Sequence, residues 1–244
     1  MPTPCCSVLE LRQYTLVPGK RDVLIELFER AFIEGQEAVG MRVVGQFRHL
    51  DRPDRFVWLR GFDGMPARRG ALEAFYGGPI WKANREAANA TMIDSDNVLL
   101  LRPVAPEWAF AGSTQSRSPV GAPPVRARLI FANVYSLSTP VDDSFRRLFR
   151  DAIAPALAEA GAPPLAALES EPAENNFPRL PVRTGENVFV WFASVATTEE
   201  LPALETRLMR SRRWAQAVAP ELERRLSRPP ERLRLAPTAR SLLR

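Results

Sequence analysis

The chain has 244 residues, 45% of them hydrophobic, so it can bury a sizeable core as one large or two small domains. The net charge of +5 comes mainly from arginines scattered among Glu and Asp, and no compact basic run carries the interleaved aromatics of a nucleic-acid groove. No signal peptide or membrane-spanning stretch is visible, and the adjacent Cys5 and Cys6 fit a reducing cytoplasm.

The first part of the chain has the pattern of one ferredoxin-like unit. Leu9 and Leu11 alternate with polar residues, as in a strand. Turn chemistry at residues 51–54 predicts a hairpin between the next two strands. In order, the pattern predicts a strand over 8–16, a helix over 20–39, strands over 41–50 and 55–62, a helix over 65–90 broken at Gly77-Gly78-Pro79, and a strand over 98–102. This order is typical of the split βαβ arrangement.

The second part repeats the first. Residues 104–125 are rich in Pro, Ser, Gly and Ala and predict a linker between units at residues 1–103 and 126–244. Trp58 precedes Trp81 by 23 residues, and Trp191 precedes Trp214 by the same 23. The predicted order is a strand over 129–137, a helix around 145–157, a long loop over 170–187, the Trp191 strand, a helix capped by Thr198, and a strand over 233–237. We therefore expect a tandem duplication.

Each predicted sheet has one face covered by helices and one open face. We assign the aliphatic side chains of the first sheet to the helix side: Leu9, Leu11, Val57 and Leu59. The open side then carries aromatic and charged side chains: Glu10, Arg12, Tyr14, Phe56, Trp58, Arg60 and Phe62. The second unit offers Phe131, Asn133, Tyr135, Phe189 and Trp191 at the corresponding positions. Such faces are too apolar to stay in water, so we expect the two units to pack sheet to sheet and enclose them.

Four segments together resemble the NIPSNAP family: residues 9–19, 45–47, 55–62 and 72–81. The second half resembles a diverged copy in which Met209–Trp214 replaces the Tyr-Gly-Gly-Pro segment. The resemblance implies an α+β fold of two ferredoxin-like units packed as an intrachain dimeric α/β barrel. It implies no reaction, because relatives in the wider superfamily include cofactor-free monooxygenases, cyclases, haem enzymes and binding proteins.

Glu10, Arg12, Tyr14 and Arg60 form the first candidate site. Two arginines can hold a carboxylate or enolate, and a tyrosine can donate a proton to it. The alternative is a buried Arg–Glu pair that only satisfies itself. The second half has Asn133 and Ala193 at the positions of Arg12 and Arg60, so we expect any anionic site in the first half alone.

Other candidates are aromatic or ionisable. Trp58, Phe62, Tyr76 and Trp81 form the lining of a planar-ligand pocket or, alternatively, ordinary core. His49, the single histidine, could act as a general base or ligand but lies beside a turn. Asp94 and Asp96 make a poor metal site, so we expect no bound metal and no cofactor.

These patterns favour a small-molecule-binding barrel of the cytoplasm whose inter-sheet cavity accepts an anionic or aromatic ligand. One hypothesis is a cofactor-independent enzyme of specialised metabolism that cyclises, isomerises or oxygenates its substrate. The alternative is a non-catalytic carrier or a protein-interaction module. A homodimer is compatible with either.

Overall fold

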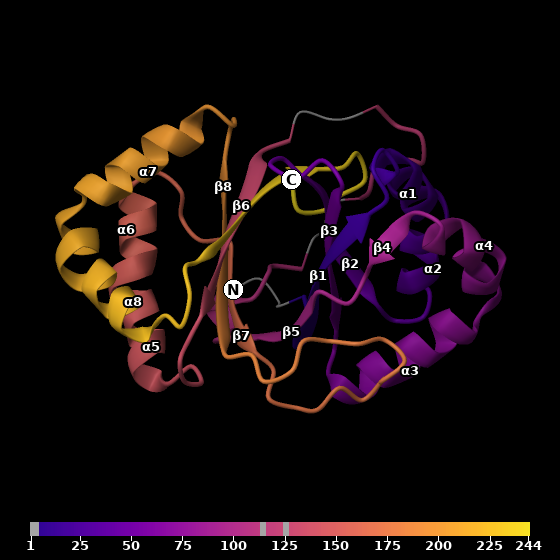
Figure 1. Ribbon diagram of the computed structural model, residues 1–244, viewed down its shortest axis with the longest axis horizontal. Helices are drawn as coiled ribbons and strands as arrows, with labels where there is room; N and C mark the ends of the chain where they lie inside the picture. Colours follow the sequence, from indigo (N-terminus) through magenta and orange to yellow (C-terminus); the bar gives the residue numbers. More distant parts are fainter. Residues whose placement is uncertain (1–4, 113–115, 124–126) are drawn as a thin grey trace.

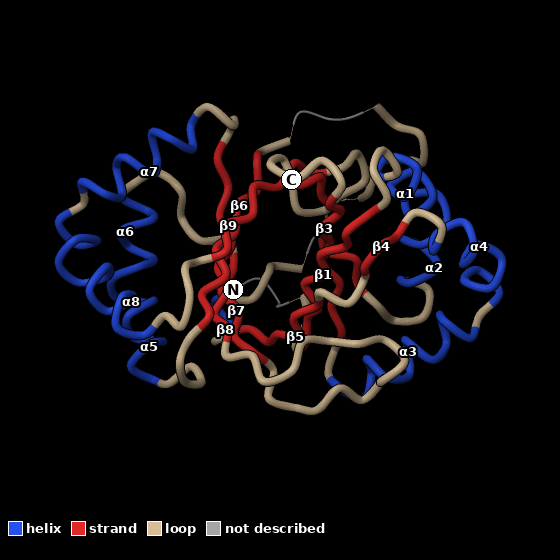
Figure 2. The backbone as a smooth tube through the Cα atoms, viewed as in Figure 1, coloured by secondary structure: helices blue, strands red, loops and turns tan. Residues whose placement is uncertain are grey.

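The structure is a computed structural model that describes residues 5–112, 116–123 and 127–244. Its strands form two sheets that face each other in the centre, and helices cover the outer face of each sheet (Figure 1). The strand pairs in Figure 2 therefore lie between two helical layers, one built by each half of the chain. This order of layers decides which side chains meet helices and which meet the opposite sheet.

The first half follows the predicted order. Its elements are β1 (Val8–Leu16), α1 (Arg21–Leu27), the π-helical turn η1 (Phe28–Phe32), α2 (Ile33–Glu37), β2 (Arg42–His49), β3 (Arg55–Phe62), α3 (Met65–Gly77), α4 (Pro79–Asn89), β4 (Met92–Asp94) and β5 (Val98–Pro103). The predicted helix break is confirmed, because Gly78 is extended between α3 and α4.

The second half repeats this order after the 3-10 turn η2 (Pro106–Trp108). Its elements are β6 (Leu129–Ser136), α5 (Asp143–Leu148), the π-helical turn η3 (Phe149–Ile153), α6 (Ala154–Glu159), β7 (Ala166–Ser170), β8 (Val188–Val195), α7 (Glu200–Arg210), the π-helical turn η4 (Trp214–Val218), α8 (Ala219–Arg225) and β9 (Glu231–Pro237). The predicted Thr198 cap is wrong, because α7 begins at Glu200, whose carboxylate itself accepts the Ala196 N–H.

Eight strands of the described chain close into one antiparallel barrel. Around the barrel the order is β3-β2-β9-β6-β8-β7-β5-β1, and β1 pairs back with β3. The halves join at two seams, β2 with β9 and β5 with β7. Each half contributes four strands in ferredoxin-like order, which confirms the predicted fold class.

The barrel interior is mainly aliphatic. The inward side chains of the first half include Leu9, Leu11, Val57 and Leu59, all fully buried. They pack against Ile130, Val134, Leu168, Val190, Leu233 and Leu235 of the second half. The predicted faces of the first sheet are therefore reversed, and these leucines and valines face the other sheet instead of the helices.

The aromatic and charged face lies under the helices. Tyr14, Phe56 and Trp58 pack with Phe28 and other helical side chains in a cluster confined almost wholly to the first half. Facing sheets stand about 10 Å apart, which medium-sized aliphatic side chains fill. The helical layer of this half holds the larger rings, which meet edge to face.

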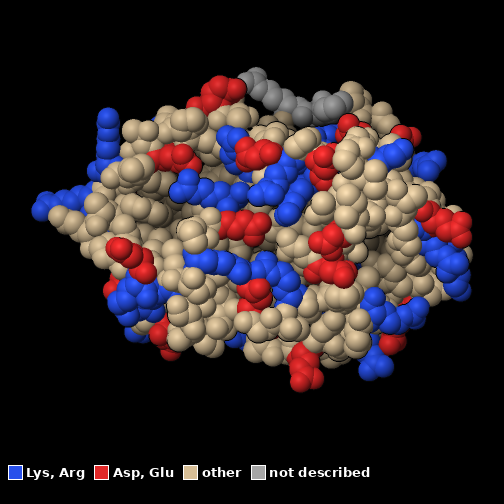
Figure 3. Space-filling model, in the orientation of Figure 1, with Lys and Arg blue, Asp and Glu red and all other residues tan. Residues whose placement is uncertain are grey.

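The outer surface carries both signs of charge. In the face seen in Figure 3, Lys and Arg side chains are interspersed with Asp and Glu side chains. This agrees with the arginines scattered through the sequence. No helix among the described residues is both long and apolar enough to cross a membrane.

Gly61 sits where β3 meets the chain before β1, and it tests the packing of the barrel. A Cβ at Gly61 would lie 2.1 Å from Cys6 Sγ, whereas a Cβ at the exposed Gly70 of α3 meets nothing within 4 Å. We expect Gly61→Ala to lower the free energy of unfolding by ~1–3 kcal/mol through overpacking. Gly70→Ala, the control, raises it by ~0.5–1 kcal/mol because alanine favours the helix. Equal effects in urea denaturation would contradict this packing.

Candidate functional site

Glu10 lies at the centre of a buried ion cluster with three arginines. Its Oε2 accepts hydrogen bonds from Arg12 Nη1 and Arg60 Nε, and its Oε1 accepts one from Arg68 Nε, each at 2.7 Å. None of the four side chains is more than 1% exposed. Glu10 and Arg12 lie on one face of β1, Arg60 is the cross-strand partner of Glu10 on β3, and Arg68 comes from α3.

The cluster has an excess of positive charge, because three guanidinium groups face one carboxylate. The Nη2 atoms of Arg60 and Arg68 have no hydrogen-bond partner among the described residues, although Arg60 Nη2 lies 2.7 Å from Glu10 Oε2. The remaining partners are neutral acceptors: Tyr14 Oη, Gln36 Oε1, Met41 Sδ, Tyr76 Oη, Ser95 O, Asn175 Oδ1 and Asn176 Oδ1. Buried charge is costly unless it is paired, so the cluster favours a further anion.

The charges fix the protonation of the cluster. Burial would raise the pKa of Glu10, but Arg60, Arg12 and Arg68 outweigh it and hold the pKa well below its usual range. Burial lowers the pKa of Arg68, and Glu10 offsets only part of this effect. For Arg12, burial is outweighed by Tyr14 and Glu10, which raise its pKa. Glu10 is therefore ionised at neutral pH.

A cavity of about 210 Å³ lies between the first sheet and its helices, in contact with the partners of these arginines. Aromatic rings form most of its wall: Tyr14, Phe28, Phe32, Trp58, Phe75, Tyr76, Trp81 and Phe177. Gln36, Arg179 and Leu180 are among its other lining residues. The predicted position between the sheets is wrong, because the polar face of β1 and β3 points toward the helices.

The hydrogen-bond donors of the wall include Tyr14, Trp58 and Tyr76. Tyr14 Oη accepts from Arg12 Nε at 3.0 Å, and Tyr76 Oη accepts from Arg60 Nη1 at 3.4 Å. Because a guanidinium N–H points at each hydroxyl oxygen, each hydroxyl proton is left to donate elsewhere. Trp58 Nε1 is buried and has no acceptor among the described residues. Donors backed by positive charge fit an anion.

Tyr14 is a neutral donor in this setting. Burial raises its pKa, although the neighbouring Arg12 and Arg60 work in the opposite direction. The guanidinium carbon of Arg12 lies 5.5 Å from the centre of the Tyr14 ring, and that of Arg60 lies 5.1 Å from the Trp58 ring. Cations over these faces are held by the ring electrons as well as by Glu10.

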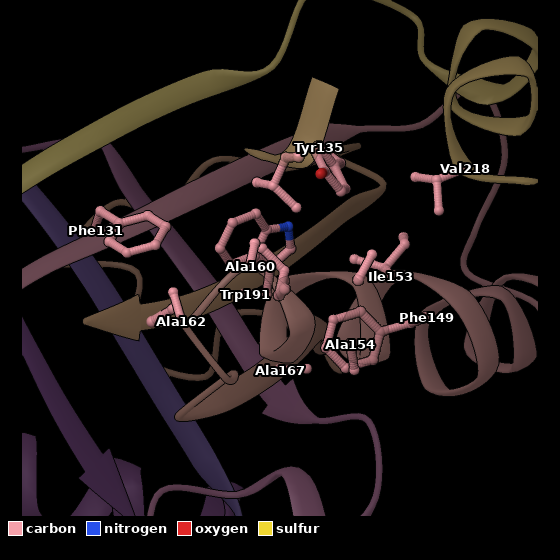
Figure 4. Close-up of a cluster of buried hydrophobic side chains, with 14 of the residues drawn as sticks. Phe131, Tyr135, Phe149, Ile153, Ala154, Ala160, Ala162, Ala167, Trp191 and Val218 are labelled. Carbon is pink, nitrogen blue, oxygen red and sulfur yellow. The ribbon is translucent and has the colours of Figure 1, made fainter. Parts of the chain in front are cut away.

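The second half has no such cluster at the equivalent positions. Strand register pairs Phe131 with Ala193 where the first half pairs Glu10 with Arg60. Figure 4 shows the result, a buried apolar group around Trp191 in which Phe131 and small alanines surround the indole. Burial also raises the pKa of Tyr135 to about 12. The positions of the second half that correspond to Glu10 and Arg60 are therefore apolar, and an anion site in the first half alone stays a prediction.

Of the other site residues that the sequence predicted, some line the cavity and others do not. Trp58, Tyr76 and Trp81 line the cavity, whereas Phe62 packs behind it, 5.7 Å from the guanidinium carbon of Arg60. His49 does not line the cavity, and its Nδ1 accepts the Asp51 N–H at 3.1 Å within a turn.

Asp94 and Asp96, which the sequence analysis considered as metal ligands, lie within one local turn. Asp94 lies at the end of β4 and accepts the N–H of Asp96. No group of three or more His, Cys, Asp or Glu in the described ranges is arranged to hold a metal ion.

Sequence analysis missed the residues that helices and loops bring to the site. Arg68 belongs to a helix whose pattern does not distinguish buried from exposed arginines. Gln36 is the one polar residue of α2 that is fully covered, at 1% exposed. Phe177 and Arg179 come from the predicted long loop of the second half, and the length of that loop was the available signal.

Comparison with known proteins relates part of the chain to a family and nearly all of it to a known fold. Residues 9–106 match the NIPSNAP family model. No curated protein matches the chain. Among solved structures, an anthrone oxidase-like protein is 13% identical with a TM-score of 0.60, and the match covers 98% of this chain and 94% of that one.

Two further structures share the fold over nearly their whole length. A putative monooxygenase from Fusobacterium nucleatum is 8% identical with a TM-score of 0.59, covering 96% of this chain and 93% of that one. A putative monooxygenase from Lactobacillus acidophilus is 12% identical with a TM-score of 0.54, covering 98% and 97%. At these identities the likeness establishes the fold alone.

Glu10→Gln tests the charge balance of the cluster. Removing the only carboxylate leaves three buried guanidinium groups, so we expect the free energy of unfolding to fall by ~3–5 kcal/mol. Glu169→Gln is the control, because Glu169 is also buried but pairs with the partly exposed Arg102 and Arg146. The free energy of unfolding should fall less in Glu169→Gln than in Glu10→Gln. Chemical denaturation of both variants measures this difference. A negligible loss of unfolding free energy in Glu10→Gln would contradict a buried ion cluster centred on Glu10.

His49 predicts a pH dependence of stability. Burial, followed by the charges of Arg52 and Arg55, lowers its pKa from 6.5 to about 4, so the unfolded chain binds a proton before the folded one does. Stability from His49 is present above pH 6.5 and is lost as the pH falls toward 4. We expect His49→Gln to flatten the unfolding free energy between these values. Parallel curves for variant and wild type would contradict a buried neutral imidazole.

Proposed function

We propose that this chain, a member of the NIPSNAP family, binds a small aromatic anion in the cavity between its first sheet and the helices of the first half. One observation carries the proposal. Two hydroxyls of the cavity wall, those of Tyr14 and Tyr76, accept hydrogen bonds from Arg12 and Arg60, and these two buried arginines share a single carboxylate with Arg68. A ligand carboxylate or enolate supplies the missing negative charge.

The walls support an aromatic ligand of limited size. A cavity of roughly 150 Å³ lined by apolar side chains holds benzene, so about 210 Å³ accommodates one ring with a small substituent. The rings of Phe28, Trp58 and Tyr76 offer faces and edges at different angles, which favour contact with a planar ring. A bulkier polycyclic ligand requires movement of the wall.

Tyr14 gives the site a possible chemistry. Its neutral hydroxyl, polarised by Arg12, can donate a proton to an oxygen on which negative charge develops, such as an enolate. This supports cofactor-independent isomerisation, cyclisation or oxygenation in specialised metabolism, and the names of the structures that share the fold are compatible with oxygenation. A carrier that retains its ligand without turnover is the second candidate, because nearly the whole ion cluster is sealed from solvent.

The proposal also includes three expectations about the whole protein: its division into units, its compartment and its partners. Residues 1–103 and 126–244 form two duplicated units joined by the linker 104–125. The protein works in a reducing cytoplasm, which the free thiols of Cys5 and Cys6 support. Its partner is a small molecule rather than a nucleic acid, and a homodimer is compatible with the proposal.

Binding is tested by titration calorimetry with benzoate and the uncharged benzamide. We expect benzoate to bind and benzamide to bind at least tenfold more weakly, because a hydrogen bond to a charged group contributes ~1.5–3 kcal/mol. Trp58→Phe removes one donor and should weaken benzoate about tenfold or more on the same basis. The matched control is Trp191→Phe at the equivalent position of the second half, which should leave the affinity unchanged.

Equal binding of benzoate and benzamide would contradict an anion site. An equal loss in Trp58→Phe and Trp191→Phe would place the effect in general packing rather than in the cavity.

A further inference from the structure

We infer that the β7–β8 loop of the second half, residues 171–187, determines the specificity of the first half's cavity, and that Arg179 selects ligands with a second acidic group. The inference rests on the proposed function, since it names the substrate class of the same site. That class is a single aromatic ring with two acidic groups, such as an aromatic dicarboxylate.

The loop is fixed at both ends to the first half. Glu171 N donates to Leu100 O at 3.0 Å and Arg183 N donates to Val98 O at 2.9 Å, so the loop runs along β5 of the other half. In the tube of Figure 2 this long segment passes from β7 and β8 across to the side of α3. The corresponding connection in the first half is the short turn between β2 and β3.

The loop also contacts the ion cluster directly. Arg68 Nη1 donates to Asn175 Oδ1 at 3.0 Å and to Asn176 Oδ1 at 2.8 Å. Asn176 Nδ2 donates to Met65 O at 2.6 Å, which ties the loop to the start of α3. If the loop left this position, a buried guanidinium would lose two of its hydrogen-bond acceptors, so the loop is a fixed wall of the site.

Inside this wall the loop presents two apolar side chains and one charged side chain. The Phe177 ring is buried and lies nearly parallel to that of Tyr76, with an interplanar angle of 27° and centroids 6.1 Å apart. Leu180 lines the cavity beside it. Arg179 also lines the cavity but is exposed, and within the described ranges it makes no ion pair and no hydrogen bond.

Two parts of the cavity wall therefore favour negative charge. One part has the hydroxyls of Tyr14 and Tyr76, which accept hydrogen bonds from Arg12 and Arg60. The other is the exposed Arg179, which makes no ion pair within the described ranges. An aromatic ring with two acidic groups can satisfy both parts, whereas a monoacid satisfies only one.

The test compares the affinities of benzoate and terephthalate by titration calorimetry at low ionic strength. Arg179→Gln is compared with Arg210→Gln, an exposed arginine of α7 that lies outside the cavity lining. Exposed ion pairs contribute modestly, so the ratio of terephthalate to benzoate affinity should fall about threefold to fivefold in Arg179→Gln. Benzoate affinity should change less than about twofold, and Arg210→Gln should behave like wild type.

The outcomes separate the two proposals. If wild type binds neither acid, the anion site itself is wrong and this inference fails with it. If wild type binds benzoate but the terephthalate ratio is the same in wild type and Arg179→Gln, the anion site stands and the role of Arg179 is refuted. A fall of the ratio in Arg210→Gln of equal size would also refute it, because the effect would then reflect net charge.

Discussion

The structure depends on the burial of one carboxylate among three guanidinium groups. Glu10 joins β1, β3 and α3 through hydrogen bonds of 2.7 Å, so the same contacts that hold α3 on the sheet also create an excess of positive charge. A buried pair is seldom a source of net stability, and an unbalanced cluster is less so. The presence of such a cluster is best explained if a bound anion supplies the missing negative charge.

The fold places its stabilising core and its candidate site in different layers. Between the sheets, mainly aliphatic side chains from both halves pack together in the barrel, with Phe47, Phe110 and Phe192 among them. Outside the first sheet, aromatic rings and arginines leave a cavity of about 210 Å³ under the helices. The second half packs the equivalent space with Phe131, Trp191 and alanines, and contributes its long β7–β8 loop to the site of the first half. The two halves thus share one site.

Much of the fold could be predicted from sequence because alternation and turn chemistry are local signals. The repeated tryptophan spacing and the strand order predicted two ferredoxin-like units, and the open-face argument and the resemblance to the NIPSNAP family predicted that they form one barrel. Alternation identifies two faces of a strand but does not say which face meets helices. Leu9 and Glu10 were therefore assigned to the wrong layers. Arg68 and Phe177 were missed because tertiary contacts alone bring them to the cavity.

The most direct test of the anion site is a crystal structure of the protein with 4-bromobenzoate, in which anomalous scattering locates the bromine. The account predicts a bromine peak inside the cavity lined by Tyr14, Trp58 and Phe177, with the carboxylate toward the tyrosine hydroxyls. A peak between the two sheets, or an empty cavity at saturating ligand concentration, would contradict it.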